Sequence, residues 1–216
     1  MSASAPYPRP DALMLLGTHC PYCPTVLKGL SDLVKSGVVG KLEAVNIEQH
    51  PEIARALGVR SVPWVRIGPF ELEGLRSEKE LRGWAETAGT EAGYASYLDE
   101  ILSTGKIHRA IKLVQNNPDA LKALLLLFSN PETQLNTRIG ISAIIESLAG
   151  SELLQGTVDR LGELSQHNDP RIRGDVAHYL GLTGSDKAIS YIEHLMGDPD
   201  TDVRAIATES LELLKA

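Results

Sequence analysis

Two cysteines three positions apart most constrain how this chain can fold. Cys20 and Cys23 follow a continuous apolar run, Ala12–Leu16, and residues 23–36 then carry apolar side chains at helical spacing. The run is typical of a strand buried on both faces, so the pair is predicted at a strand–turn–helix junction. Because no other cysteine occurs in the chain, the pair indicates catalysis or metal binding in a reducing compartment rather than a disulfide framework.

The predicted junction favours redox chemistry at the two thiols. Cys20 is expected at or just before the helix N-terminus, where unpaired N–H groups and the helix dipole lower a thiol pKa from about 8.5 to between roughly 3.5 and 7.5. Cys20 is therefore the predicted nucleophile, and Cys23, beneath it, resolves the mixed disulfide. Between them, Pro21 stiffens the turn and Tyr22 offers an apolar face to a docking peptide or small thiol.

The remaining apolar patterns of the first 90 residues predict a small α/β domain. Predicted strands cover residues 12–16, 42–47, 64–67 and 70–72, and predicted helices cover residues 23–36, 51–57 and 77–88. This order, βαβαββα, implies a mixed sheet with helices on both faces. We expect the domain to span residues 1–90, with a linker at residues 89–93.

On these motifs, residues 12–88 resemble the thioredoxin/glutaredoxin superfamily. Cys-Pro-Tyr-Cys is the motif typical of dithiol glutaredoxins, and residues 46–51 with residues 58–63 follow the thioredoxin pattern that leads to a cis-proline loop. The resemblance implies a thioredoxin-like fold and a cis peptide bond between Val62 and Pro63 that faces the cysteines. It also implies that the Val62 backbone offers strand-like hydrogen bonds to a substrate.

The sequence departs from the family pattern at several positions around the site. By the resemblance, the buried acid of thioredoxins falls at Met14, its lysine partner at Ala44 and the tryptophan before the first cysteine at His19, so no internal carboxylate base is expected. His19 either assists the Cys20 thiolate as a donor or proton shuttle, or only shapes the rim of the site. We include it among the substrate-binding residues.

No cofactor is expected at the site, although two alternatives remain. The basic residue and the Gly-Gly-x-Asp-like stretch of glutathione sites are replaced by residues 16–18 and 73–77, which leaves glutathione at most as a co-substrate. His19, Cys20 and Cys23 can supply three zinc ligands, but neighbouring residues have awkward ligand geometry and no second Cys-x-x-Cys exists. The strand–turn–helix setting therefore favours redox chemistry over metal binding.

The sequence pattern of the second half of the chain, residues 91–216, predicts an all-helical repeat domain. The pattern of apolar residues at 137–145 recurs at 172–180 and 203–211, at intervals of 35 and 31 residues, and residues 158–164 recur at 189–195. Such a period predicts a solenoid of helix pairs. The segments 168–173 and 200–204 resemble the openings of HEAT repeat helices, in which an Asp caps the helix and an Arg braces neighbouring units. That resemblance implies a protein-binding scaffold; the alternative is a helical cover for the redox domain.

Charge separates the two halves and bears on the partners. Of 21 basic and 28 acidic residues, residues 1–90 hold ten of each, so the net charge of −7 lies entirely in the helical half. Acidic surfaces repel phosphate backbones and anionic lipids, which argues against nucleic acid and membrane partners. The first ten residues carry no targeting signal, and no apolar run reaches the length of a membrane span.

These observations predict a cytoplasmic thiol-disulfide oxidoreductase with a role in cell redox homeostasis. Its expected partners are a disulfide-bonded protein substrate, an electron donor and a protein bound by the helical domain. The alternative function is a redox-gated interaction module, in which the Cys20–Cys23 bond changes the surface without turnover. Turnover of a model disulfide distinguishes the two.

Overall fold

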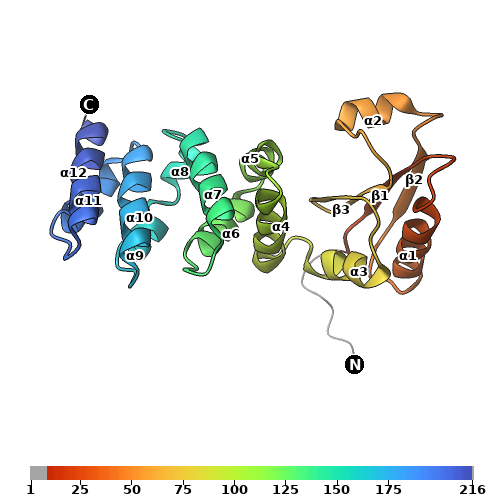
Figure 1. The fold of residues 1–216 in the computed structure, drawn as a ribbon, viewed down its shortest axis with the longest axis horizontal. Coiled ribbons are helices and arrows are strands. Elements are labelled where there is room, and N and C mark those ends of the chain that lie inside the picture. Colours follow the sequence, from red (N-terminus) through yellow and green to blue (C-terminus); the bar gives the residue numbers. More distant parts are fainter. Residues whose placement is uncertain (1–8, 216) are drawn as a thin grey trace. The chain divides into compact units, whose positions relative to one another are not determined.

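The protein consists of two compact units, which comprise residues 1–94 and 95–216 in the computed structural model (Figure 1). The structure describes residues 9–215. Most of the N-terminal stretch that we inspected for a targeting signal, residues 1–8, therefore lies outside the described residues. Within residues 9–215, no helix combines the length and the apolar character needed to cross a bilayer.

A four-stranded mixed sheet forms the centre of the N-terminal unit. Its strands are β1 (Ala12–Leu16), β2 (Leu42–Asn46), β3 (Trp64–Ile67) and β4 (Phe70–Glu73), in the order β2-β1-β3-β4. β1 pairs in parallel with β2 and antiparallel with β3, so Leu15 lies between Val45 and Trp64. All three of these side chains are buried. The predicted strands are therefore confirmed, with small shifts at the ends of β2 and β4.

Helices cover both faces of this sheet, as the sequence pattern predicts. Helices α1 (Cys23–Lys35) and α3 (Glu78–Thr87) pack together, and α2 (Pro51–Leu57) lies apart from them with the strands between (Figure 1). Ala54 of α2 belongs to the same buried cluster as Leu15 and Trp64. The ring of Trp84 in α3 meets that of Phe70 edge-on, with centroids 5.3 Å apart. The cysteine pair therefore sits on a well-packed scaffold, at the β1–α1 junction.

The segment predicted as a linker, residues 89–93, is partly helical. Helix α4 (Glu91–Ser103) begins inside it. Gly93, at the end of the predicted linker, is buried in this helix and lies against Thr87, where a Cβ atom would overlap the Thr87 carbonyl oxygen. The glycine thus permits a close approach of two backbone segments, and this packing outweighs the low helix propensity of glycine.

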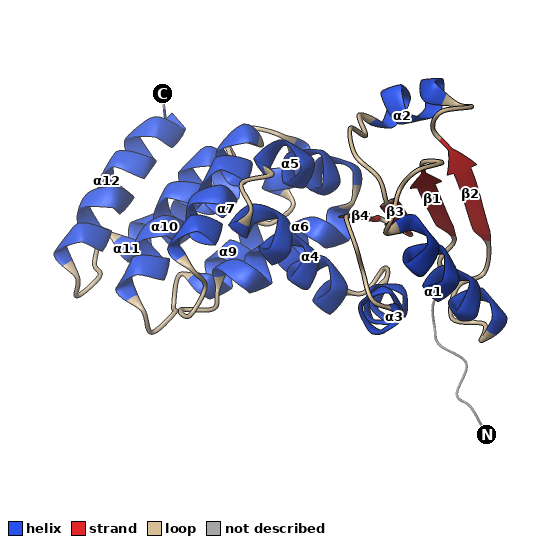
Figure 2. Cartoon of the chain, turned by 45° about the vertical axis from the view of Figure 1, so that its right-hand side comes forward, coloured by secondary structure: helices blue, strands red, loops and turns tan. Residues whose placement is uncertain are grey.

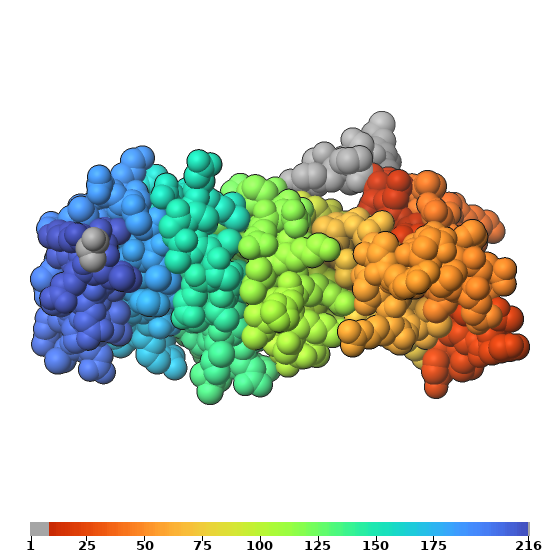
Figure 3. All heavy atoms as spheres, turned by 90° about the horizontal axis from the view of Figure 1, so that it is seen from above, coloured from red at the N-terminus to blue at the C-terminus, as the bar shows by residue number. Residues whose placement is uncertain are grey.

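Apart from one short 3₁₀ turn, the described part of the C-terminal unit contains only α-helices and their connections (Figure 2). After α4 come α5 (Ile107–Asn116), α6 (Pro118–Phe128), α7 (Leu135–Ser147), α8 (Glu152–Gln155), α9 (Val158–Leu164), α10 (Pro170–Leu182), α11 (Ile189–Leu195) and α12 (Thr201–Lys215). The three recurring registers lie in α7, α10 and α12, and the second recurring pattern lies in α9 and α11. In Figure 3 the segments of this unit follow one another as bands from green to blue, as expected for stacked repeats.

An arginine in each of the three registers links its helix to the neighbouring loops. The Nη1 atoms of Arg138, Arg173 and Arg204 donate to the backbone carbonyls of Phe128, His167 and Asp198, at 3.4, 2.8 and 2.7 Å. Two of these arginines also reach forward to an acid of the next repeat, Arg138 to Asp175 and Arg173 to Asp198. The hydrogen bonds from Arg173 lower the pKa of the nearly buried Asp198. The bracing role that the HEAT resemblance implies is therefore seen for Arg173, and Arg138 makes the same kind of contact, whereas Arg204 bonds to the segment just before its own helix.

Candidate redox site

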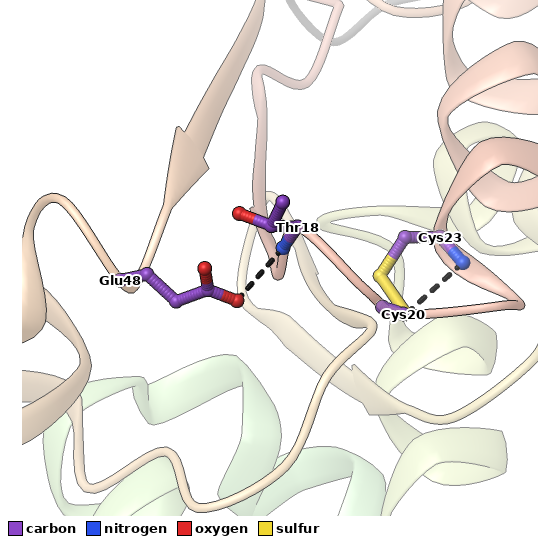
Figure 4. Close-up of a disulfide and its surroundings, with 4 residues drawn as sticks. All are labelled: Thr18, Cys20, Cys23 and Glu48. Carbon is purple, nitrogen blue, oxygen red and sulfur yellow. Dashed lines mark hydrogen bonds between the residues drawn. A yellow bond between two sulfur atoms is a disulfide. The ribbon is translucent and has the colours of Figure 1, made fainter.

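Cys20 and Cys23 form a disulfide at the start of helix α1, with Cα atoms 5.4 Å apart (Figure 4). The residue before the helix, Tyr22, contributes no side-chain cap. Instead, the backbone N–H of Cys23 points at Cys20 Sγ, and the two atoms are 3.1 Å apart. A free N–H group at a helix N-terminus stabilises negative charge. The geometry therefore favours a thiolate on Cys20 when the disulfide is reduced.

The two sulfur-bearing residues differ in exposure, as predicted. Cys23 is 4% exposed and belongs to the face of α1 that packs on the sheet, whereas Cys20 is half-buried. Pro21 and Tyr22 between them are exposed, and the Tyr22 side chain is among the large apolar groups that face solvent. Cys20 is thus the more accessible of the two sulfur-bearing residues, and Cys23 lies beneath it.

Val62 and Pro63 form the second wall of the site. The peptide bond between them is cis, which confirms the prediction. Pro63 is buried and Val62 is half-buried. Val62 lies next to the cysteine loop, because a Cβ atom on Gly17 would stand 3.3 Å from Val62 Cγ2 and 3.9 Å from Cys20 Cβ. The absence of a side chain at Gly17 lets the two loops meet.

A third loop, which the sequence analysis did not assign to the site, reaches the same point. Glu48 follows strand β2, and its Oε1 atom would stand 3.4 Å from a Cβ atom on Gly17. Oε1 accepts a 2.9 Å hydrogen bond from the Thr18 backbone N–H (Figure 4). Asn46 completes the connection, since its Nδ2 donates to Thr18 Oγ1 at 3.0 Å and its Oδ1 accepts from the Glu48 N–H at 2.9 Å. Thr18 and Glu48 are thirty residues apart, so no local pattern marks this pairing.

Glu48 is an ionised carboxylate at the rim of the site. Hydrogen bonding from the Thr18 side chain, then from its backbone N–H, lowers the pKa of Glu48, and the nearby His19 adds a smaller effect in the same direction. Both Glu48 and His19 are exposed. The structure thus provides a carboxylate near Cys20, but at the surface rather than at the buried position that thioredoxins use.

The remaining features around the cysteine pair are His19, the metal-ligating residue types and a small cavity. His19 precedes Cys20 directly in the exposed loop, and among the described residues its ring makes no hydrogen bond to either sulfur atom. Within residues 9–215, no three His, Cys, Asp or Glu side chains gather in a way that could hold a metal ion. A small cavity of about 150 Å³, lined by Arg60, Trp64 and Glu73 among others, lies beside the cis-proline loop.

The burial and hydrogen bonding of the cysteine pair predict that Cys20 is the reactive thiol after reduction. We expect its pKa below the ordinary value of about 8.5, because the Cys23 N–H and the helix N-terminus favour the thiolate. The measurement is the pH dependence of iodoacetamide labelling in the single variants Cys23→Ser and Cys20→Ser, each of which leaves one thiol. Faster labelling of Cys23 than of Cys20 near neutral pH would contradict the assignment.

Comparison with known proteins identifies both parts of the chain. Residues 12–86 match the family model described as a thioredoxin domain, and residues 121–212 match the one described as HEAT repeats. A comparison with curated proteins finds no match. The two matched segments coincide with the sheet unit and with most of the helical array. The chain therefore joins a thioredoxin domain to an array of HEAT repeats.

Proposed function

We propose that the protein is a dithiol oxidoreductase that reduces disulfide bonds in other proteins. One observation carries the proposal: within a thioredoxin domain, Cys20 Sγ accepts the first N–H of α1 while it is bonded to the buried Cys23. A half-exposed sulfur atom at a helix N-terminus is suited to attack, and a buried partner sulfur atom in contact with it is suited to resolve the product.

The exchange proceeds in two balanced steps from the reduced protein. The Cys20 thiolate attacks one sulfur atom of the substrate disulfide, forms a mixed disulfide and releases the other substrate sulfur as a thiolate, which takes up a proton. Cys23 then loses its proton and attacks Cys20 Sγ, which closes the Cys20–Cys23 disulfide and releases the second substrate thiol. The substrate gains two electrons, and the protein returns to the oxidised form seen in the structure.

The groups that flank Cys20 provide the docking contacts in this proposal. Tyr22 presents an apolar ring on one side, and Val62 with the cis Pro63 forms the other side. An extended substrate chain would lie between them and pair with the Val62 backbone as an added strand, a mode that supplies affinity without selecting a sequence. His19 lines the entrance from the cysteine loop.

The HEAT repeats select the protein substrate in this proposal. They contain no cysteine, so they contribute contacts rather than electron transfer. Leu135 and Ile139, one turn apart on α7, are 72% and 57% exposed. Two large apolar side chains on one helical face, in an acidic unit, form the anchor for an apolar segment of a neutral or basic protein.

A small thiol or a dithiol reductase would return electrons to the Cys20–Cys23 pair. Glutathione is one candidate for this donor. Its carboxylates would bind in the small cavity that Arg60 lines. The proposed setting is the cytoplasm, where thiols are kept reduced. Supporting this setting, both cysteines of the chain belong to one exchange pair, and the sequence contains no further cysteine for a structural disulfide.

The full-length protein should catalyse the reduction of insulin disulfides by dithiothreitol. Cys20→Ser should lower the rate to that of dithiothreitol alone, because the attacking sulfur is lost. Cys23→Ser should instead accumulate mixed disulfides, because the resolving sulfur is lost. Mass spectrometry of proteins trapped by Cys23→Ser from a lysate then names the substrates. A wild-type protein without turnover would leave the redox-gated interaction module as the better description.

The recognition role predicts a selective defect on the helical array. Full-length Leu135→Ser/Ile139→Ser should lose about tenfold or more in kcat/KM for a trapped protein substrate, since truncating apolar anchors costs about 1–2 kcal/mol each. Its turnover of a small disulfide should stay unchanged. Leu213→Ser is the matched control, because Leu213 is 55% exposed on another helix, α12. Equal losses in both variants, or no loss in either, would contradict a recognition surface on α7.

A further inference from the structure

Three loops of the thioredoxin domain meet at Gly17, and only one of them contributes a carboxylate. The loops are the β1–α1 loop with Cys20, the loop after β2 with Glu48, and the loop with Val62. Glu48 Oε1 and Cys20 Cβ both lie within 4 Å of the position that a Gly17 Cβ would occupy. The Glu48 carboxylate and the Cβ atom that carries the Cys20 sulfur therefore approach the same point in space.

The contacts of Glu48 give it two separable effects on Cys20. Its Oε1 atom holds the Thr18 N–H at 2.9 Å, two residues before Cys20, and Asn46 closes the ring through the Thr18 hydroxyl. This anchors the cysteine loop to the end of β2. The second effect comes from its negative charge. A carboxylate near a sulfur atom disfavours the thiolate, since like charges repel.

We propose that Glu48 is a positioning residue of the redox site, which anchors the loop that carries Cys20 and opposes the formation of the Cys20 thiolate. The inference rests on the proposed function, in which Cys20 is the attacking thiol. A thiolate stabilises the reduced form of a dithiol pair, so a group that opposes the thiolate favours the disulfide. Glu48 thus biases the pair towards donating electrons, the direction that a reductase needs.

The charged and titratable groups around Cys20 can be named from each neighbouring element. His19 adjoins it in its own loop, Cys23 lies in α1, and Glu48 comes from the loop after β2. On the cis-proline side, Arg60 lines the separate small cavity with Trp64 rather than the contact at Gly17. Within this described set, Glu48 is the carboxylate that directly adjoins the point where the loops meet.

The experiment measures the Cys20 thiol pKa in full-length Cys23→Ser protein by pH-dependent iodoacetamide labelling. Glu48→Gln keeps an oxygen for the Thr18 N–H but removes the charge. The distances of 3.4 and 3.9 Å to the Gly17 Cβ position place Glu48 Oε1 at most about 7 Å from Cys20 Cβ. A unit charge at about that separation in solvent-exposed surroundings moves a thiol pKa by about half a unit, so the Cys20 pKa should fall by that amount. Labelling below the pKa should then be about threefold faster. In 1 M salt the difference should shrink, because screening then acts over about 3 Å.

Two further variants separate the charge from the anchor. Glu48→Ala should lower the pKa as Glu48→Gln does, and should also speed deuterium exchange at the Thr18 amide, which Glu48→Gln protects. Glu43→Gln, at the other end of β2, is the matched control: it removes one exposed charge and should change neither quantity. An unchanged or raised pKa in Glu48→Gln would overturn the charge effect, and unchanged Thr18 exchange in Glu48→Ala would overturn the anchor.

The readout is independent of the proposed reductase function. Thiol labelling reports the Cys20 pKa whether or not the wild-type protein turns over a disulfide. A protein with no turnover but with the predicted shift in Glu48→Gln would refute the function and retain the role of Glu48. Turnover of a disulfide without that shift in Glu48→Gln would support the function and refute the role of Glu48.

Discussion

The chemistry of the site depends on where helix α1 begins. Because the helix starts at Cys23, its first N–H points at Cys20 Sγ rather than at solvent or a side-chain cap. β1, an inner strand of the sheet, leads into the loop that carries Cys20, and the buried face of α1 holds Cys23 beneath.

Two opposing electrostatic influences act on Cys20 in this arrangement. In our proposals, the helix N-terminus favours a thiolate on Cys20, which speeds attack on a substrate disulfide, and the Glu48 carboxylate opposes that thiolate. A thiol with too low a pKa is a poor nucleophile and stabilises the reduced form too strongly. In our account the balance lets Cys20 react near neutral pH while the pair still gives up its electrons.

Local sequence patterns were sufficient for most of the fold. The apolar runs at β1 and β3 and the helical spacing in α1 reproduce the observed elements closely, since one local period decides each of them. The cysteine pair and the cis Val62–Pro63 bond were also predicted, the latter from family resemblance. The repeated apolar positions of the helical array were also predicted correctly, because each repeat packs against the neighbouring repeat of similar sequence.

The features that were not predicted depend on packing between distant segments. Glu48 joins the site through Thr18, thirty residues earlier. The local signal for this contact is the turn in which the Asn46 side chain accepts a hydrogen bond from the Glu48 backbone N–H. Gly93 looks like a linker residue in sequence, but in the fold it permits contact between α4 and Thr87. In both cases the residue type is informative only once its spatial neighbour is known.

The reduction potential of the Cys20–Cys23 couple distinguishes an exchange pair from a structural disulfide. The full-length protein is equilibrated with glutathione buffers, and its dithiol fraction is measured by thiol alkylation and mass spectrometry. An exchange pair that reduces protein disulfides should lie between about −200 and −270 mV, the range from glutaredoxins to thioredoxin. A value below about −300 mV would identify a structural disulfide and contradict the account.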